Sequence, residues 1–280
     1  MPELAEADYF RKRWQYAAGG STVTAVSVHP GAKIFRGADP AALARALRGQ
    51  KLLGSQTGGK QMLFRFSGGC WLGIHLGMSG ELRVEPPGFL PGKHDHLVLQ
   101  TARHALVFND PRMFGRVRFD RGLAEPAWWR ALAPPVLSAA FSERALAAFL
   151  RRRGRAPIKA VLLMQERFPG VGNWMADEIL WRAGIHPRQP AGSLRPADVR
   201  SLWRECRQVC RLALAAIAGR GLKPAPTLKG SLPKSWLFNH RWEEGGRDPR
   251  TGTPLARATI GGRTTCWSPA RQKFRAQTPT

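Results

Sequence analysis

The hydrophobic periodicity of this chain changes once, and that change restricts the possible folds more than any other feature. Between residues 22 and 120 the apolar residues come in short alternating pieces such as MLFRF and HLVLQT, a pattern typical of β-strands. From the LAPPVL stretch at residues 132–137 the spacing becomes helical, and a long apolar stripe follows Pro196. A short amphipathic helix over residues 3–17 precedes the strands. We therefore predict an α+β protein with a β-rich first half and a helical second half.

The same changes in pattern divide the chain into four segments. We expect a first domain over residues 1–125, a linker over 126–140 and a helical domain over 141–222. Residues 223–280 begin with a segment rich in Pro, Gly and Lys. They continue into ARATIGGRTTCW, where a Gly-Gly turn between two strand-like pieces predicts a β-hairpin.

The excess of positive charge indicates a polyanionic partner. The chain has 44 lysines and arginines against 19 aspartates and glutamates, a formal net charge of +25, which is far more than solubility requires. Arginine supplies 34 of these cations, and its planar guanidinium matches phosphate oxygens better than an ammonium group does. Ribosomal proteins, membrane-surface proteins and enzymes that act on DNA all remain compatible with this charge.

Other features of the composition favour a reducing cytoplasm. No run of 18 apolar residues could cross a membrane, and the N-terminus lacks the apolar core of a signal peptide. The four cysteines form no C-x-x-C pair, and Cys206 and Cys210 fall on the apolar stripe after Pro196, as core residues do. We expect a cytoplasmic protein that makes no use of a membrane.

The turn PGVGN leads directly into a second helical pattern, WMADEILWRAG. A glycine-rich turn before a helix N-terminus exposes backbone N–H groups and the positive end of the helix dipole, so it can bind an anion without a charged side chain. Asn173 would add a side-chain donor. In isolation such a turn is more often an ordinary link between helices, but the charge of this chain favours an anion site.

The N-terminus offers a nucleophile. If Met1 is removed, as a small second residue permits, Pro2 becomes a secondary amine; an ordinary α-amino group has a pKa of roughly 8, which leaves a useful neutral fraction at neutral pH. Attack of such an amine on a sugar C1′ gives an iminium. Glu3 is a carboxylate placed for general acid/base catalysis, and Glu6, one helical turn on, faces the same side. Taken alone, the sequence MPEL is also compatible with an ordinary helix start that has no catalytic role.

Five separated segments together resemble the formamidopyrimidine-DNA glycosylases, the family that includes endonuclease VIII. They are MPEL at the N-terminus, HLGMSGELR at 75–83, KHDHLVL at 93–99, NDPRMFG at 109–115 and GVGNWMADEILWRAGIHP at 170–187. They occur in the family's order and span nearly the whole chain. The resemblance implies an N-terminal β-sandwich, a helix-two-turn-helix domain and a C-terminal β-hairpin finger, with DNA as the bound partner.

The resemblance also implies an activity, that of a base-excision-repair DNA glycosylase with AP lyase activity. Pro2 would displace the damaged base and form a Schiff base that undergoes β- and δ-elimination, and Glu3 would handle protons at the sugar. Lys60 resembles a lysine that binds the phosphate near the lesion. The residues that would bind the rest of the DNA are Asn173, His94, Arg112 and the finger arginine Arg263.

Excision requires the damaged base to leave the stack, and something must fill the gap. By the same resemblance Met78, Arg112 and Phe114 would fill it: a flexible thioether, a guanidinium that addresses the orphaned base, and an aromatic wedge. The alternative for these residues is a place in the sandwich core. We favour the wedge, because the DPRMF segment puts charge and ring on a turn.

The MPEL start and the three gap-filling residues favour the oxidised-purine branch of the family, acting on 8-oxoguanine and formamidopyrimidine in duplex DNA. Ala5 stands where the family usually has proline and Asp8 replaces a longer acid, which changes the entry into the helix but not the proposed catalytic groups. The segment GLKPAPTLKGSLPK is shorter than the usual lesion-covering loop, and this departure keeps alternatives open for the base preference. The alternatives are a preference for oxidised pyrimidines or abasic sites, and a relative that binds damaged DNA without cutting it. A ribosomal-type binding protein would need neither Pro2 nor Glu3. We expect a monomer associated with a bacterial nucleoid.

Relatives commonly hold the finger with zinc bound by two C-x-x-C pairs. The matching stretches here, residues 243–255 and 261–272, contain only Cys266. One thiolate cannot make a tetrahedral zinc site, and His240 does not repair it. We therefore predict a zincless finger held by other contacts. The candidates are packing of Trp236, Trp242 and Trp267, the fixed φ of Pro249, Pro254 and Pro269, and pairing of Asp248 with nearby arginines.

Three histidines, His75, His94 and His96, could suggest a metal site elsewhere. They alternate along strand-like segments without a cluster of cysteines or carboxylates, so a structural role is the better prediction. We predict that the protein binds no metal and no other cofactor.

Overall fold

A computed structural model describes residues 2–29, 31–219 and 228–276 of the chain. The chain forms two compact units. Unit 1 comprises residues 1–132 and 218–223, and unit 2 comprises residues 133–217 and 224–280. Strands dominate unit 1 and helices dominate unit 2, so the predicted α+β class is confirmed. Among the described residues, no helix is both long and apolar enough to cross a membrane.

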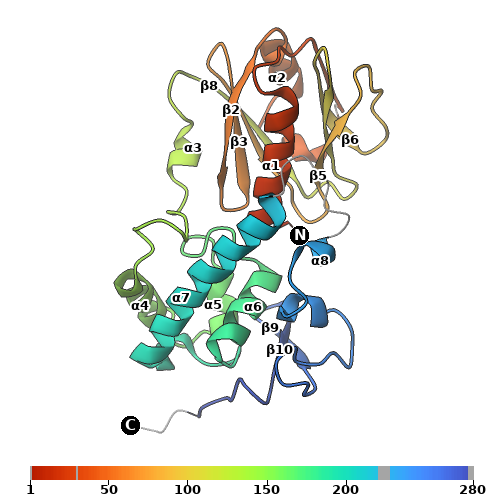
Figure 1. The fold of residues 1–280 in the computed structure, drawn as a ribbon. Coiled ribbons are helices and arrows are strands. Elements are labelled where there is room, and N and C mark those ends of the chain that lie inside the picture. Colours follow the sequence, from red (N-terminus) through yellow and green to blue (C-terminus); the bar gives the residue numbers. More distant parts are fainter. Residues whose placement is uncertain (1, 30, 220–227, 277–280) are drawn as a thin grey trace. The chain divides into compact units, whose positions relative to one another are not determined.

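Unit 1 is a sandwich of two four-stranded antiparallel sheets (Figure 1). The first sheet has the strand order β1-β6-β7-β5 and the second has the order β2-β3-β4-β8. The bounds are β1 (Ala25–Val28), β2 (Leu52–Gly58), β3 (Gln61–Phe66), β4 (Cys70–His75), β5 (Glu81–Glu85), β6 (Asp95–Gln100), β7 (Ala105–Asn109) and β8 (Arg116–Arg121).

Alternation along the strands fills the space between the two sheets. Phe64 of β3, Leu72 of β4 and Phe108 of β7 point inward and are completely buried. The outer face of the second sheet is covered by α3 (Ala127–Arg130), whose tryptophans pack on Trp71. This short helix lies in the stretch that the sequence predicts to be a linker.

Helices cover the two open edges of the sandwich. The N-terminal helix α1 (Leu4–Ala18) packs between the edge strands β2 and β5 (Figure 1). Its buried Trp14 donates a hydrogen bond from Nε1 to the carbonyl of Arg83 at 2.9 Å. At the other edge, α2 (Pro40–Leu47) packs on β1, and the 3-10 helix η1 (Lys33–Phe35) packs on β8. The sequence analysis predicted α1 but not α2.

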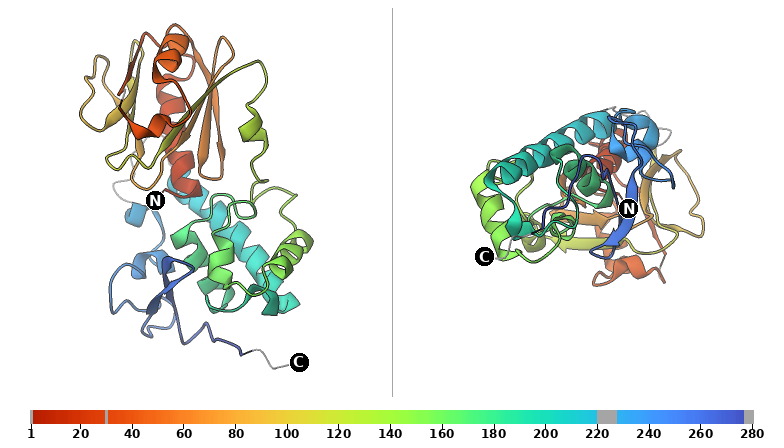
Figure 2. Two further views of the ribbon diagram at one scale, coloured as in Figure 1. Left: turned by 180° about the vertical axis from the view of Figure 1, so that it is seen from behind. Right: turned by 90° about the horizontal axis from the view of Figure 1, so that it is seen from below.

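Unit 2 is built around a long helix, α7 (Pro196–Ala213), which packs against α4 (Glu143–Arg152) and α6 (Asn173–Ala183) (Figure 2). The apolar stripe predicted after Pro196 is its buried face, and Cys206 and Cys210 lie in the core as expected. The turn before α6 begins this helix at Asn173, and Gly184 ends it with a left-handed φ of 67°. The other helices are α5 (Ile158–Leu162), η2 (Ala191–Ser193), η3 (Leu214–Ala218), α8 (Leu228–Ser231) and η4 (Leu237–His240).

The predicted C-terminal hairpin is present. Strands β9 (Ala256–Ile260) and β10 (Arg263–Trp267) pair antiparallel, and the turn between them has φ of +59° at Gly261 and +74° at Gly262. Two consecutive left-handed residues make the tight turn that matches strand twist, and glycine adopts it without strain. The first half of the segment compared with a lesion-covering loop, residues 221–227, lies outside the described residues.

Candidate functional site

The strand register brings the candidate residues of unit 1 to one end of the sandwich. Gln61 at the start of β3 pairs with His75 at the end of β4, which in turn pairs with Arg116 at the start of β8. The turn between β2 and β3, the loop after β4 and the loop before β8 therefore all leave the second sheet at this end. They carry Lys60, Met78, Arg112 and Phe114.

The first sheet contributes to the same end, because short loops join it to the second sheet there. Residues 76–80 link β4 to β5, and residues 110–115 link β7 to β8. Asp95 at the start of β6 pairs with Asn109 at the end of β7, so His94 is also placed at this end. His94 is half-buried, and its carbonyl accepts a hydrogen bond from the backbone N–H of Asp110 at 3.0 Å.

The N-terminal helix begins at this end as well. Arg11 donates to the carbonyl of Ser55, and Asp8 accepts from the hydroxyl of Thr57 at 2.9 Å, so α1 runs antiparallel to β2. The first turn of α1 consequently lies beside the turn that carries Lys60 (Figure 1). All the residues of unit 1 that the sequence analysis singled out for catalysis or DNA binding thus gather at one end.

Pro2 and Glu3 directly precede the first turn of α1. Pro2 is half-buried, and Glu3, in extended backbone at the N-cap position, has only 2% of its surface exposed. Glu6 is also buried, at 7% exposure. Glu3 is therefore a carboxylate shielded from bulk water and adjacent in sequence to Pro2.

The three predicted gap-filling residues lie at the surface and not in the sandwich core. Met78 is 37% exposed, Phe114 is 49% exposed, and the guanidinium of Arg112 lies 4.8 Å from the centre of the Phe114 ring. Gly77, with φ of +65°, lies so close to the backbone of Phe114 that a Cβ atom would collide with it. This glycine therefore lets the two loops touch, which brings Met78 and Phe114 close together.

His75 supports the first of these loops. Its Nδ1 accepts a hydrogen bond from the N–H of Gly77 at 3.0 Å, which requires this nitrogen to be unprotonated. Burial lowers the pKa of His75, and the charges of Lys60 and Arg118 lower it further. The imidazole is therefore neutral at neutral pH, and the two cations around it make this end of unit 1 electropositive.

In unit 2 the structure brings Asn173 and Arg263 close together. Asn173 is the first residue of α6, and its Nδ2 donates to the carbonyl of Thr264 at 2.8 Å, next to Arg263 in β10. Arg263 is exposed directly after the hairpin turn. Gly261 packs so closely on α5 that a Cβ would lie 2.6 Å from that of Ala160. A helix N-terminus and an arginine thus share one surface, an arrangement suited to phosphates.

A buried ionic cluster, which the sequence analysis did not identify, attaches the hairpin to α6. The carboxylate of Asp177 accepts from Lys159 Nζ, from Arg241 Nη2 at 2.6 Å and from the backbone N–H of Cys266 at 3.0 Å. All three side chains are almost completely buried. Lys159 also donates to the carbonyl of Asn173 at 2.7 Å. One carboxylate therefore links α5, α6, β10 and the segment after η4.

The residues of the finger do not fit zinc. Burial, with the neighbouring charge of Asp177, raises the pKa of the Cys266 thiol to about 11, whereas a zinc ligand must be a thiolate. The carboxylate of Asp248 already accepts from Trp181 Nε1 at 3.1 Å and from the N–H of Arg250 at 2.8 Å. Within the described part of the chain, no three His, Cys, Asp or Glu side chains form a group that could hold a metal ion.

The structure shows which of the contacts predicted to replace zinc are present. Trp236 is buried and stacks with the guanidinium of Arg182 at 4.4 Å, and Trp267 packs on His186 at 5.4 Å. Trp242 is 47% exposed and contributes less. The carboxylate of Asp248 accepts hydrogen bonds from Trp181 Nε1 and from the backbone N–H of Arg250, and it interacts electrostatically with the guanidinium of Arg271.

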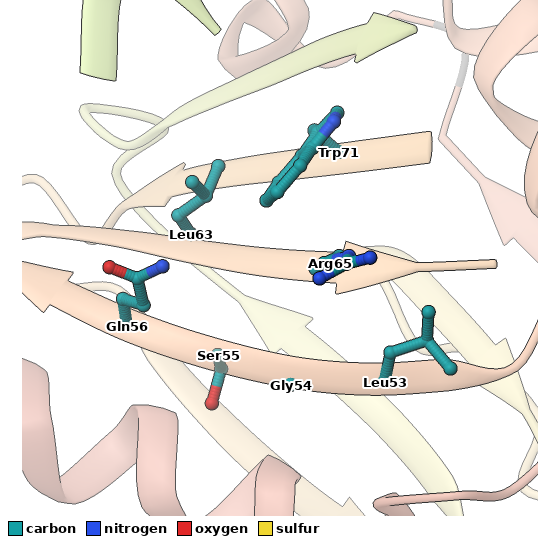
Figure 3. Close-up of a pocket in the computed structure, with 7 residues that line it drawn as sticks. All are labelled: Leu53, Gly54, Ser55, Gln56, Leu63, Arg65 and Trp71. Carbon is teal, nitrogen blue, oxygen red and sulfur yellow. The ribbon is translucent and has the colours of Figure 1, made fainter. Parts of the chain in front are cut away.

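A hollow of about 270 Å³ lies on the outer face of the second sheet (Figure 3). Arg65 lies over the ring of Trp71 at 5.7 Å, and no predicted site residue lines the hollow. Its lining includes no carboxylate and no amine, so the end of the sandwich remains the better candidate for the catalytic site. Its lining residues are Leu53, Gly54, Ser55, Gln56, Leu63, Arg65 and Trp71.

Two family models match successive parts of the chain. Residues 1–117 match the formamidopyrimidine-DNA glycosylase N-terminal domain, and residues 132–222 match the formamidopyrimidine-DNA glycosylase H2TH domain. The chain belongs to the formamidopyrimidine-DNA glycosylase family. The resemblance inferred from the five sequence segments is thereby confirmed.

Curated relatives extend this agreement over the full chain. The formamidopyrimidine-DNA glycosylase of Roseiflexus sp. (strain RS-1) is 34% identical over 275 residues, covering 98% of this chain and 100% of the relative. The formamidopyrimidine-DNA glycosylase of Thermus thermophilus is 35% identical over 277 residues, covering 97% and 98%.

Solved structures of family members have the same fold. A complex between the LlFpg protein, a THF-DNA and an inhibitor has a TM-score of 0.85 at 25% identity, covering 97% of this chain and 100% of that chain. Wild-type Lactococcus lactis Fpg with a DNA that contains N7-benzyl-Fapy-dG has a TM-score of 0.85 at 23% identity, with the same coverage.

Proposed function

We propose that this DNA glycosylase removes oxidised purines, 8-oxoguanine and formamidopyrimidine, from duplex DNA and then cleaves the strand as an AP lyase. The observation that supports this proposal most directly is the gathering of site residues at one end of unit 1. Pro2 and the buried Glu3 lie at the same end as the exposed Met78, Arg112 and Phe114, because α1 runs antiparallel to β2.

The proposed chemistry begins when Met1 has been removed. The Pro2 nitrogen attacks C1′ of the damaged nucleotide, the N-glycosidic bond breaks, and its electron pair leaves with the base, which takes up a proton. Opening of the sugar gives an iminium between Pro2 and C1′. Loss of a C2′ proton then expels the 3′ phosphate by β-elimination, and loss of the C4′ proton expels the 5′ phosphate by δ-elimination. Water finally hydrolyses the C=N bond of the iminium, which frees the amine and leaves the sugar fragment as an aldehyde. Glu3 is the carboxylate that moves protons at the sugar.

The proposed DNA contacts come from both units. Lys60, His94 and Arg112 would contact DNA from unit 1, while Asn173 and Arg263 would bind phosphates from unit 2. One amide hydrogen of Asn173 is used by Thr264, which leaves the second for a phosphate. We propose that the enzyme acts as a monomer in a bacterial cytoplasm, without zinc or another cofactor.

Borohydride trapping tests this function. The wild-type protein should form a covalent adduct with a duplex that holds a preformed abasic site, and Pro2→Gly should abolish it. Glu3→Gln should lose base excision far more than trapping, because an existing aldehyde needs no base to be expelled. Glu143→Gln, a carboxylate in the first turn of α4, is the matched control and should behave as wild type.

Three outcomes would contradict parts of the proposal. Retention of Met1, seen by intact mass, would block the amine and exclude the Schiff base. Binding of abasic duplex without trapping would indicate a relative that binds damage without cutting. Preferential excision of oxidised pyrimidines would leave the chemistry intact and overturn the assignment of the lesion.

A further inference from the structure

Asp110 joins the two loops that carry the proposed gap-filling residues. We call residues 76–80 and 110–115 the wedge loops. The carboxylate of Asp110 accepts from the hydroxyl of Ser79 in the first loop at 2.8 Å through Oδ1. Through Oδ2 it accepts from the N–H of Gly115 at the end of the second loop at 2.7 Å. Asp110 has no exposed surface, so water does not compete for these hydrogen bonds.

The backbone of the second wedge loop is also fixed by Asp110. Its carbonyl accepts from the N–H of Met113 at 3.1 Å and lies 3.0 Å from Nε2 of the buried His96. Met113 has φ of 52°, a left-handed conformation that a non-glycine residue holds only when its surroundings impose it. The residues on either side of Met113 are Arg112 and Phe114, so this turn sets the direction of both side chains.

We propose that Asp110, acting through Ser79, is the positioning residue that makes the two wedge loops enter the DNA stack as one rigid unit. This inference rests on the proposed role of Met78, Arg112 and Phe114 in filling the gap. Insertion requires a base step to unstack, which costs free energy. If the two loops were loosely connected, insertion would also have to order them, and this loss of conformational entropy would make insertion less favourable. The Ser79 hydroxyl is the side-chain link from Asp110 to the first loop.

The size of the effect follows from the kind of bond. A hydrogen bond between a hydroxyl and a buried carboxylate is charge-assisted, and its loss should slow insertion about tenfold. Ser79 itself is half-buried and lies outside the sandwich core cluster, so Ser79→Ala removes the link without opening the core. Ser79→Thr keeps the hydroxyl and should restore the rate.

The experiment measures insertion of the wedge loops separately from excision of the base. A duplex with 8-oxoguanine beside 2-aminopurine reports unstacking by stopped-flow fluorescence, and single-turnover excision is measured on the same duplex. The variants are Ser79→Ala, Ser79→Thr, Asp110→Asn and Phe114→Ala, together with the double variant Phe114→Ala/Ser79→Ala. The matched control is Ser67→Ala, which removes a hydrogen-bonded hydroxyl at the opposite end of the sandwich.

Positioning through the wedge predicts a non-additive result. Ser79→Ala should slow the fluorescence step about tenfold in the wild-type background and less than about twofold when Phe114 is already alanine, because the link then has little to position. Asp110→Asn, which keeps an acceptor for Gly115 and gains a donor for Ser79, should fall between wild type and Ser79→Ala. Ser67→Ala should match wild type.

Two results would overturn the inference: an unchanged fluorescence step in Ser79→Ala, or equal slowing in both backgrounds. If Asp110→Asn fails to fold, the Ser79 variants still test whether the link between the wedge loops positions them. Failure of the proposed function has a separate signature, because the wild-type protein would then neither excise 8-oxoguanine nor be trapped on an abasic site.

Discussion

Removal of the Asp177 carboxylate should release the hairpin from α6. In Asp177→Ala the ammonium of Lys159 and the guanidinium of Arg241 stay buried, at 0% and 5% exposure, without the anion between them. Breaking a buried ion pair from one side costs about 3–5 kcal/mol, because the remaining charge is left uncompensated. The N–H of Cys266 loses its acceptor as well, which places the expected loss toward the upper end of that range.

Chemical denaturation followed by tryptophan fluorescence measures this loss in the free energy of unfolding. The matched control is Asp198→Asn, which weakens two surface ion pairs, with Arg195 at 68% exposure and Arg275 at 37%, and should cost about 1 kcal/mol. Asp177→Ala should also weaken binding to an abasic-site duplex, since Asn173 and Arg263 lose their fixed spacing. If Asp177→Ala destabilises the protein no more than Asp198→Asn does, the cluster does not hold the hairpin.

Three further predictions concern DNA binding, metal and pH. Asn173→Ala and Arg263→Ala should weaken binding to lesion-containing and undamaged duplexes alike, and in a salt titration the affinity of the arginine variant should depend less on salt concentration. A loss of affinity confined to lesion-containing DNA would contradict the proposed phosphate contacts. Activity should be insensitive to chelators, and stoichiometric zinc in tag-free protein, lost together with activity on chelation, would refute the zincless finger. The pKa of His75 in the folded protein lies below its ordinary value of 6.5. As the pH falls through 6.5, the imidazole therefore binds a proton in the unfolded chain before it does so in the folded protein, and the free energy of unfolding should decrease. His75→Asn should flatten that part of the stability curve between about pH 7 and about pH 5, and an unchanged slope would show that His75 does not cause it.

Local features of the sequence predicted most of the fold. Alternating apolar residues marked the strands, and the apolar stripe after Pro196 became the buried face of α7. The Gly-Gly turn was predictable because two left-handed residues in a row favour glycine. For α2 a signal was present but was not used: Asp39 caps the helix by accepting from the N–H of Ala41, and Pro40 is its first residue.

The candidate site was predictable only where its residues stand in recognisable segments. The exposure of Phe114 followed from its place in a turn, whereas the link from Asp110 to Ser79 spans 31 residues and depends on the register of the sheets. The Asp177 cluster spans 64 residues to Arg241, and the hydrogen bond from Asn173 to Thr264 spans 91. Nothing local in WMADEILW distinguishes a carboxylate in an ionic cluster from one on a solvated helix face.

The attachment of the hairpin through Asp177 bears on how the protein would fare under oxidative stress. A zinc-thiolate centre is held by thiolates, the form of cysteine that peroxides attack. Here the attachment uses a carboxylate, an ammonium and a guanidinium, none of which peroxide oxidises, and the nearby Cys266 is 2% exposed with a thiol of raised pKa. We therefore expect the conditions that oxidise guanine in DNA to leave the groups that attach this hairpin intact.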